Sequence, residues 1–220
     1  VRNELTRELL AEKITLDTAR LNIMDVPTRK LNHKFMVAEW LWMSFGRSDV
    51  ESIARYNSQL KQFSDDGMWF AGSYGPHINA QKPRMIEKLR ADPLTRQAVL
   101  EIPRPQAPTK DEPCTLSLQF LYRFERLHCI ATMRSSDIWL GVPYDVFNFT
   151  QIQNAIAGIL GWKVGWFKLN MGSSHFYMRD APNYLSVFRD GERPRSYLSP
   201  ELPGWPPAWL DKVLLTGKRD

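Results

Sequence analysis

Cysteine is scarce in this chain of 220 residues, which holds only Cys114 and Cys129. Two cysteines are too few for a disulfide framework or a four-cysteine zinc site, so each needs its own explanation. No apolar run approaches the ~20 residues that a membrane-spanning helix needs. The first residues also lack the apolar segment of a secretory signal peptide. We therefore expect a cytoplasmic protein without a structural metal or a disulfide.

A concentrated basic stripe is absent as well. The chain has 29 basic and 24 acidic residues, a net charge of +5, and its only local basic clusters are Arg193-Pro194-Arg195 and Lys218-Arg219. Proteins that bind polymeric nucleic acid usually gather such a surplus on one face. The thin spread favours a small phosphorylated ligand instead.

The composition is that of an ordinary globular protein, with 43% hydrophobic and 24% charged residues. There is no internal repeat, and the length suits one domain spanning residues 1–220. Apolar spacing predicts a helix over residues 31–45 with Asn32 as its N-cap, and a second helix over residues 83–91. A third helix is expected from Asn148, as its cap, to Gly161.

Three segments show the pattern of strands: residues 96–102, 115–124 and 127–133. The tail from Gly191 is rich in proline and tryptophan, which favours a surface loop with one short helix. Helices and strands do not alternate regularly along the chain. The sequence therefore predicts an α+β domain.

Cys114 follows Asp-Glu-Pro and opens one of the predicted strands. A junction between loop and strand exposes a side chain, as a nucleophilic thiol requires. A lone cysteine is more often a small buried hydrophobic residue. Cys129, in mid-strand on the apolar side, fits that ordinary role, and Cys114 fits it less well.

Polar groups crowd into residues 133–145, which run Met-Arg-Ser-Ser-Asp-Ile-Trp-Leu-Gly-Val-Pro-Tyr-Asp. The simplest interpretation is a solvated loop. Trp139, Leu140 and Val142 would not be freely solvated, however. We therefore expect the charges of this segment to face a ligand cleft.

These residues carry a resemblance to a known family. In order along the chain stand Pro113-Cys114, Arg134-Ser135-Ser136-Asp137, Leu140-Gly141-Val142-Pro143 and His175-Phe176-Tyr177, preceded by Glu39-Trp40-Leu41-Trp42, Tyr74-Gly75 and Asp92-Pro93-Leu94-Thr95-Arg96. From about residue 20 to residue 180 the chain resembles the thymidylate synthase family. The resemblance implies a mixed β-sheet flanked by helices and a homodimer packed through the sheets.

The resemblance also implies roles for single residues. Cys114 would add to C6 of a pyrimidine nucleotide, so that C5 attacks 5,10-methylene-tetrahydrofolate, the co-substrate. Glu39, Tyr74 and Asp145 would complete the catalytic group. The nucleotide would be held by Arg134, Ser135, Arg96 (from the neighbouring subunit), His175, Tyr177, Asp145 and Arg2. The folate would be held by Asp137, Tyr144 and Trp42.

Glu39 admits two interpretations from the sequence alone. Its expected helical neighbours are apolar, so it is either an outward-facing charge on a helix rim or a buried acid. Burial raises the pKa of a carboxyl group, which suits proton transfer. The resemblance favours the buried acid.

Three departures from the synthases point to a branch of the family. Asp145 stands where synthases have Asn, as in the cytidylate 5-hydroxymethylases, and a carboxyl group can bond the amino group or N3 of cytosine. Thr115 replaces the His that follows the cysteine. Residues 61–64 lack the Trp-rich segment, and residues 216–220 lack the apolar closing end. A less sealed site should let water capture the one-carbon unit.

We therefore predict an enzyme that 5-hydroxymethylates a cytidine nucleotide, with dCMP favoured over CMP because Ser135 matches the deoxynucleotide enzymes. Reductive methylation of dCMP or dUMP is the alternative reaction. A catalytically silent nucleotide- or RNA-binding relative is the alternative without enzymatic activity. Retention of both Cys114 and Glu39 argues against it, because binding alone needs neither.

Overall fold

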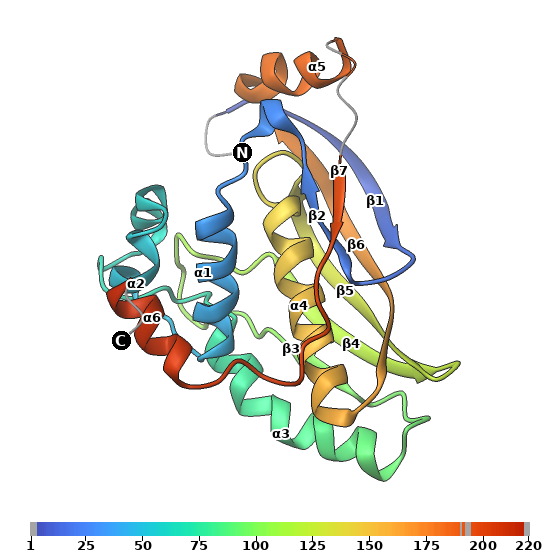
Figure 1. Cartoon of the computed structure of the whole chain (residues 1–220). Coiled ribbons are helices and arrows are strands. Elements are labelled where there is room, and N and C mark those ends of the chain that lie inside the picture. Colours follow the sequence, from blue (N-terminus) through green and yellow to red (C-terminus); the bar gives the residue numbers. More distant parts are fainter. Residues whose placement is uncertain (1–3, 190, 192–194, 218–220) are drawn as a thin grey trace.

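A five-stranded mixed sheet organises the computed structural model, which describes residues 4–189, 191 and 195–217 (Figure 1). The strand order is β1-β6-β5-β4-β3. Neighbouring strands are antiparallel except β5 and β6, which run parallel. The strands are β1 (Thr6–Leu16), β3 (Val99–Glu101), β4 (Thr115–Arg123), β5 (Arg126–Asp137) and β6 (Lys163–Tyr177).

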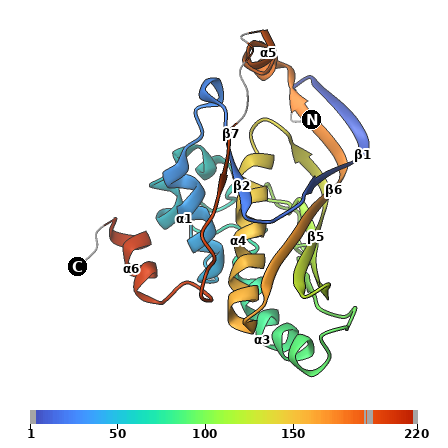
Figure 2. The same ribbon diagram turned by 45° about the vertical axis from the view of Figure 1, so that its right-hand side comes forward.

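Helix α4 (Val142–Leu160) makes the crossover that the parallel pair β5 and β6 requires. It lies between the sheet and α1 (His33–Ser44), as Figure 2 shows, and this explains why it is buried on nearly every side. Gly161 ends it in the left-handed conformation, with φ 69°. Helix α3 (Gly75–Ala91) covers the far end of the same face.

Smaller elements complete the fold. Strands β2 (Leu21–Asp25) and β7 (Arg195–Leu198) pair with each other in a separate two-stranded sheet. Helix α6 (Trp209–Thr216) packs on α1 through the buried Leu214. The rest are α2 (Val50–Ala54), α5 (Ala181–Arg189) and the 3-10 helices η1 (Pro27–Arg29), η2 (Ser58–Phe63) and η3 (Met178–Asp180).

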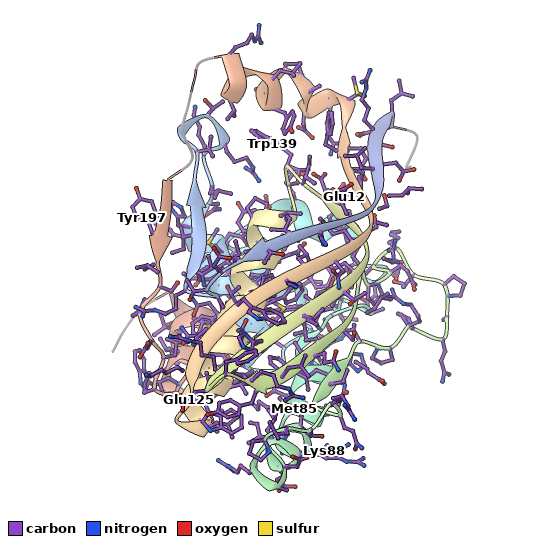
Figure 3. All side chains as sticks on the ribbon, turned by 90° about the vertical axis from the view of Figure 1, so that its right-hand side faces the viewer. Glu12, Met85, Lys88, Glu125, Trp139 and Tyr197 are labelled. Carbon is purple, nitrogen blue, oxygen red and sulfur yellow. The ribbon has the colours of Figure 1, made fainter. Side chains whose placement is uncertain are left out.

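The face of the five-stranded sheet that points away from α4 has no helix over it in the described part of the chain; Figure 3 looks onto that face. Side chains alternate across the strands, so Leu127, Cys129 and Ala131 enter the core while Ile130 and Thr132 point to the open face. Ile130 is only partly exposed.

The α+β prediction is confirmed, and so is the first helix. Asn32 caps it as expected, since its Oδ1 accepts the Phe35 backbone N–H at 3.0 Å. Asn148, in contrast, is no cap, because α4 begins at Val142. Proline near the first turn starts that helix, since its fixed φ suits the position and its missing N–H is not needed there.

Other boundaries differ from the prediction. Helix α3 begins at Gly75 rather than at residue 83 and runs through Pro83. The strand predicted over residues 96–102 is confined to β3, whereas β5 extends beyond residues 127–133 at both ends. Strands β1, β2 and β6 were not predicted from the sequence, and the tail contains β7 besides its helix.

Candidate active site

A cavity of about 250 Å³ lies where α1, the start of α3, the loop before β4 and α4 meet. Five of the residues predicted for the site line it: Glu39, Trp42, Tyr74, Cys114 and Asp145. They come from four separate segments of the chain. Phe63 and Asn148 line the cavity as well.

Cys114 immediately precedes β4 and is partly buried, whereas Cys129 is 0% exposed. Burial raises the pKa of the Cys129 thiol, so Cys129 stays a neutral core residue, as the sequence predicted. Next to Cys114, the Thr115 backbone N–H donates to the Tyr74 hydroxyl at 3.4 Å. Burial, Asp145 and Cys114 together raise the pKa of Tyr74, so its hydroxyl keeps its proton. The cavity thus holds one thiol beside a neutral phenol.

Two arginines hold the backbone around Cys114. Arg134 donates through Nε to the Pro113 carbonyl at 2.9 Å and through its second terminal nitrogen to the Glu112 carbonyl at 2.9 Å. Arg104 donates to the Pro113 carbonyl and, at 3.1 Å, to the Thr115 carbonyl. Arg104 was not among the predicted site residues, because it lies between Pro103 and Pro105, outside every motif of the family resemblance. The one feature of the sequence that could have indicated Arg104 is that it is a positively charged residue between two prolines.

Glu39 and Asp145 are two acids whose pKa values are raised. Burial raises the pKa of Glu39 to about 8, the charge of Asp145 adds to the effect, and an amide hydrogen bond from Asn148 opposes it. Burial likewise raises the pKa of Asp145 to about 7, with the Ser136 hydroxyl lowering it and Asp137 raising it. Ser136 Oγ lies 3.2 Å from Asp145 Oδ2. Near neutral pH both carboxyl groups therefore carry protons for part of the time.

Asp137 and Tyr144, assigned to the folate, are not among the residues that line this cavity. Asp137 Oδ1 accepts the backbone N–H groups of Trp139 and Leu140 at 2.8 and 2.9 Å, which fixes the carboxylate. Its Oδ2 is buried and has no hydrogen-bond partner within the described residues. Such an orphaned acceptor fits a donor from a ligand. The Tyr144 hydroxyl accepts the Asn32 N–H at 3.1 Å.

The residues assigned to phosphate and sugar lie outside the cavity lining. Ser135 Oγ and His175 Nδ1 are 3.2 Å apart, and His175 meets the Tyr177 ring edge to face at 5.6 Å. These three form one group on β5 and β6. Arg96 is exposed on the bend before β3, apart from that group. Arg2 lies outside the described residues, and all of these roles stay predictions.

Within residues 4–189, 191 and 195–217, no three His, Cys, Asp or Glu side chains gather as a metal site requires. Helices in the same part of the chain are also too short or too polar to cross a membrane.

Comparisons with known proteins agree with this arrangement. A model of the thymidylate synthase family matches residues 2–199. The deoxyuridylate hydroxymethyltransferase of Bacillus phage SP01 is 36% identical over 173 residues, covering 69% of this chain and 45% of that protein. The deoxyuridylate hydroxymethyltransferase of Pseudomonas phage M6 is 31% identical over 160 residues, covering 68% of this chain and 46% of that protein. The chain spans about half the length of these curated relatives.

A solved structure gives the same fold: the thermostable thymidylate synthase A from Bacillus subtilis matches with a TM-score of 0.74 and 21% identity, over 91% of this chain and 77% of that one. The predicted thymidylate synthase-like fold is thereby confirmed. Both phage relatives are named for uridylate, so the expected place in the cytidylate branch is not confirmed. On the match over residues 2–199, the chain belongs to the thymidylate synthase family.

Proposed function

We propose that this protein transfers a one-carbon unit from 5,10-methylene-tetrahydrofolate to C5 of a pyrimidine deoxynucleotide and releases the 5-hydroxymethyl product. The observation that carries the proposal is the meeting of Cys114, Tyr74, Glu39 and Asp145 in one cavity. A thiol for covalent attack and acids with pKa values near neutrality are what C5 substitution of a pyrimidine needs.

The proposed reaction is a covalent addition at C6 followed by substitution at C5. The Cys114 thiolate adds to C6, which makes C5 an enamine carbon that attacks the methylene group. C5 loses its proton, and tetrahydrofolate leaves with the electrons of the carbon–nitrogen bond. Water adds to the exocyclic methylene that remains, and the thiolate departs from C6. Glu39 has a pKa of about 8 and is therefore mostly neutral at neutral pH, so it can supply a proton to the base and take it back.

Cytosine is the first candidate base, with dCMP before CMP. Asp145 lines the cavity beside Glu39 and has a pKa of about 7, so slightly above neutral pH it is mostly ionised. A carboxylate accepts a hydrogen bond from the exocyclic amino group of cytosine, whereas it repels O4 of uracil. This supports a cytidine nucleotide as substrate.

Uracil is the second candidate, favoured by the names of the two phage relatives, both deoxyuridylate hydroxymethyltransferases. The raised pKa of Asp145 also weakens the sequence argument against uracil. A protonated carboxyl group offers one donor and one acceptor, as an amide does, and can therefore bond both O4 and N3–H of uracil. The choice of base thus depends on the proton of Asp145.

Residues outside the cavity lining are proposed to bind the phosphate and sugar of the nucleotide and the pterin of the folate. Ser135, His175 and Tyr177 are proposed to hold the phosphate and sugar, with Arg96 of the partner subunit reaching the phosphate. Arg134 is proposed to combine its clamp on the Cys114 loop with a phosphate contact, since its two backbone bonds leave further N–H donors. The orphaned Oδ2 of Asp137 is proposed to accept an N–H of the pterin.

The proposal is tested by incubating the protein with dCMP, CMP or dUMP and the folate, and by weighing the products. The expected product gains one CH₂O unit, and the folate is released as tetrahydrofolate. A gain of CH₂ with formation of dihydrofolate would establish reductive methylation instead. Nucleotide binding without any change of mass would establish the silent relative.

A further inference from the structure

Asn148 occupies a position that does not suit an asparagine. It is 2% exposed and lies in the interior of α4, away from both ends. Asparagine is disfavoured inside helices, and a buried amide is costly unless both its donor and its acceptor are bonded. Its Nδ2 donates to Glu39 Oε2 at 2.7 Å, but its Oδ1 is buried without a hydrogen-bond partner in the described part of the chain. Local structure therefore does not explain why an amide stands here.

Asn154, six residues further along α4, has both halves of its amide hydrogen-bonded within the protein. It is 1% exposed, its Nδ2 donates to the Pro200 carbonyl at 2.9 Å, and its Oδ1 accepts the Leu202 N–H at 3.2 Å. Both halves of that amide serve to attach the tail. Asn148 instead lines the cavity and bonds a proton-carrying side chain. This contrast indicates a functional position, where local preferences are commonly broken.

The bond from Asn148 distinguishes the two oxygens of Glu39. A neutral carboxyl group has one carbonyl oxygen, which is the better acceptor, and one hydroxyl oxygen. Because Oε2 accepts the amide N–H, the carbonyl is favoured at Oε2 and the proton at Oε1. When Glu39 ionises, the same N–H becomes a charge-assisted donor and the bond strengthens. Asn148 thus acts on both protonation states.

Other groups near Glu39 act in the opposite direction or are already paired. Asp145 of α4 raises the pKa of Glu39, and Asn148 lowers it. Tyr74, ahead of α3, and Cys114 line the same cavity, as do the loop residues Lys110, Asp111 and Glu112. The acids brought by α2 and α6, Glu51 and Asp211, are bound to Arg55 and Arg47. Asn148 Nδ2 donates a hydrogen bond to the Glu39 carboxyl, and this bond lowers the pKa that burial and Asp145 raise.

We propose that Asn148 is the positioning residue of Glu39: its amide holds the carboxyl in one orientation, keeps the proton on Oε1, and makes that proton available to a nucleotide in the cavity. The proposal rests on the proposed function only in naming the nucleotide as the recipient. In this proposal Glu39 is the residue that contacts the substrate, and Asn148 acts through Glu39. Asp145 and Asn148, three residues apart, lie on one side of α4 and present a carboxyl and an amide to the same cavity.

The test is a carboxyl titration by NMR of protein labelled with ¹³C in its glutamate side chains, with the Glu39 signal identified from its loss in Glu39→Gln. Asn148→Leu removes the donor and keeps a similar volume. The Glu39 midpoint should then rise by about one pH unit, because desolvation and Asp145 are left unopposed. Asn154→Leu, at an equally buried asparagine of the same helix, should leave the midpoint unchanged. Asn148→Ala replaces the leucine variant if that variant fails to fold.

Turnover gives the second measurement. With Asn148→Leu, the pH profile of kcat should move to higher pH together with the titration, and KM should change little. An unmoved Glu39 midpoint, or an equal shift in Asn154→Leu, would overturn the proposal even if the protein is an active one-carbon transferase. A shifted midpoint in a protein that transfers no carbon would support the pairing of Asn148 with Glu39 and refute the proposed function instead.

Discussion

We propose that the protonation state of the Asp145 carboxyl group decides between cytosine and uracil. Burial raises its pKa to about 7, with Asp137 adding to the effect and the Ser136 hydroxyl opposing it. The sequence shows the residue type and its place after Leu140-Gly141-Val142-Pro143, but it does not show the pKa. A carboxyl group with its ordinary pKa would be ionised at neutral pH and would exclude uracil, whereas the raised pKa of Asp145 weakens that exclusion.

The relative use of the two bases should therefore depend on pH. The pKa of Asp145 is about 7. At lower pH its carboxyl group is mostly neutral and can donate to O4 of uracil, whereas at higher pH the carboxylate can only accept hydrogen bonds. The ratio of kcat/KM for dUMP to that for dCMP should fall about a hundredfold as pH rises from about 6 to about 8, because the neutral form that suits dUMP falls about tenfold while the carboxylate that suits dCMP rises about tenfold. The titration of Glu39 cancels in this ratio, because the reactions of both substrates depend on Glu39 in the same way.

Asp145→Asn is the matched variant, because an amide has a donor and an acceptor at every pH. It should shift the ratio toward dUMP by roughly 10²- to 10³-fold and make it independent of pH. The same slope against pH in wild type and variant would show that another group sets the choice of base.

Strands β5 and β6 form the parallel pair that carries much of the site, and a histidine is buried beside it. His128 stacks on Trp166 with ring centroids 4.4 Å apart, and its Nδ1 accepts the Trp166 N–H at 3.0 Å. Burial lowers the pKa of His128, which keeps the ring neutral. The register between the strands shifts at Leu127 and Cys129, on either side of this ring. Gly165 leaves the room that the imidazole occupies.

Gly165→Ala should therefore destabilise the protein. A Cβ at this position would lie 2.2 Å from His128 Nδ1, so the stacked ring or the strand must move. We expect a loss of about 2–4 kcal/mol in the free energy of unfolding, measured with urea. Gly204→Ala is the control, because the nearest atom to its added Cβ would be Ile159 Cγ1 at 3.7 Å. Equal effects of the two variants would contradict the packing argument.

Elements whose sequence pattern is local could be predicted, whereas elements that depend on pairing with distant segments could not. Helix α1 was predicted because its cap, Asn32, and its apolar positions are local. Strand β1 runs Thr-Arg-Glu-Leu-Leu-Ala-Glu-Lys-Ile-Thr-Leu, rich in residues that favour helices, and it is a strand because it pairs with β6 along its length. Such tertiary pairing has no local signal. The site residues were found by motif, whereas Arg104 and Asn148 act through bonds that only the fold creates.

In the described part of the chain, one face of the five-stranded sheet has no helix over it (Figure 3). Strand alternation puts Ile130 and Trp166 on that face, and both are partly exposed. That face supports the proposed homodimer, in which Arg96 of one subunit would complete the phosphate site of the other. Arg96 lies outside the cavity lining of its own chain, as a residue with this role would.

Mixing two inactive variants tests the shared site. Arg96→Ala and Cys114→Ser should each lose activity, and a mixture should recover part of it, because hybrid dimers contain one intact site. Arg90→Ala serves as a control for loss of an arginine, since Arg90 is exposed on α3 and does not line the cavity. A fully active monomer by light scattering would rule the dimer out.

The most direct test of the account asks whether Cys114 bonds to C6 of the base. Fluorine at C5 cannot leave as a proton does, so a 5-fluoropyrimidine deoxynucleotide with methylene-tetrahydrofolate should stop the reaction at the covalent stage. Mass spectrometry should find one adduct of protein, nucleotide and folate, located on the peptide with Cys114 and missing in Cys114→Ser; Cys129, which is 0% exposed, should stay unmodified. No adduct in the wild type, or an equal adduct in Cys114→Ser, would contradict covalent catalysis by Cys114.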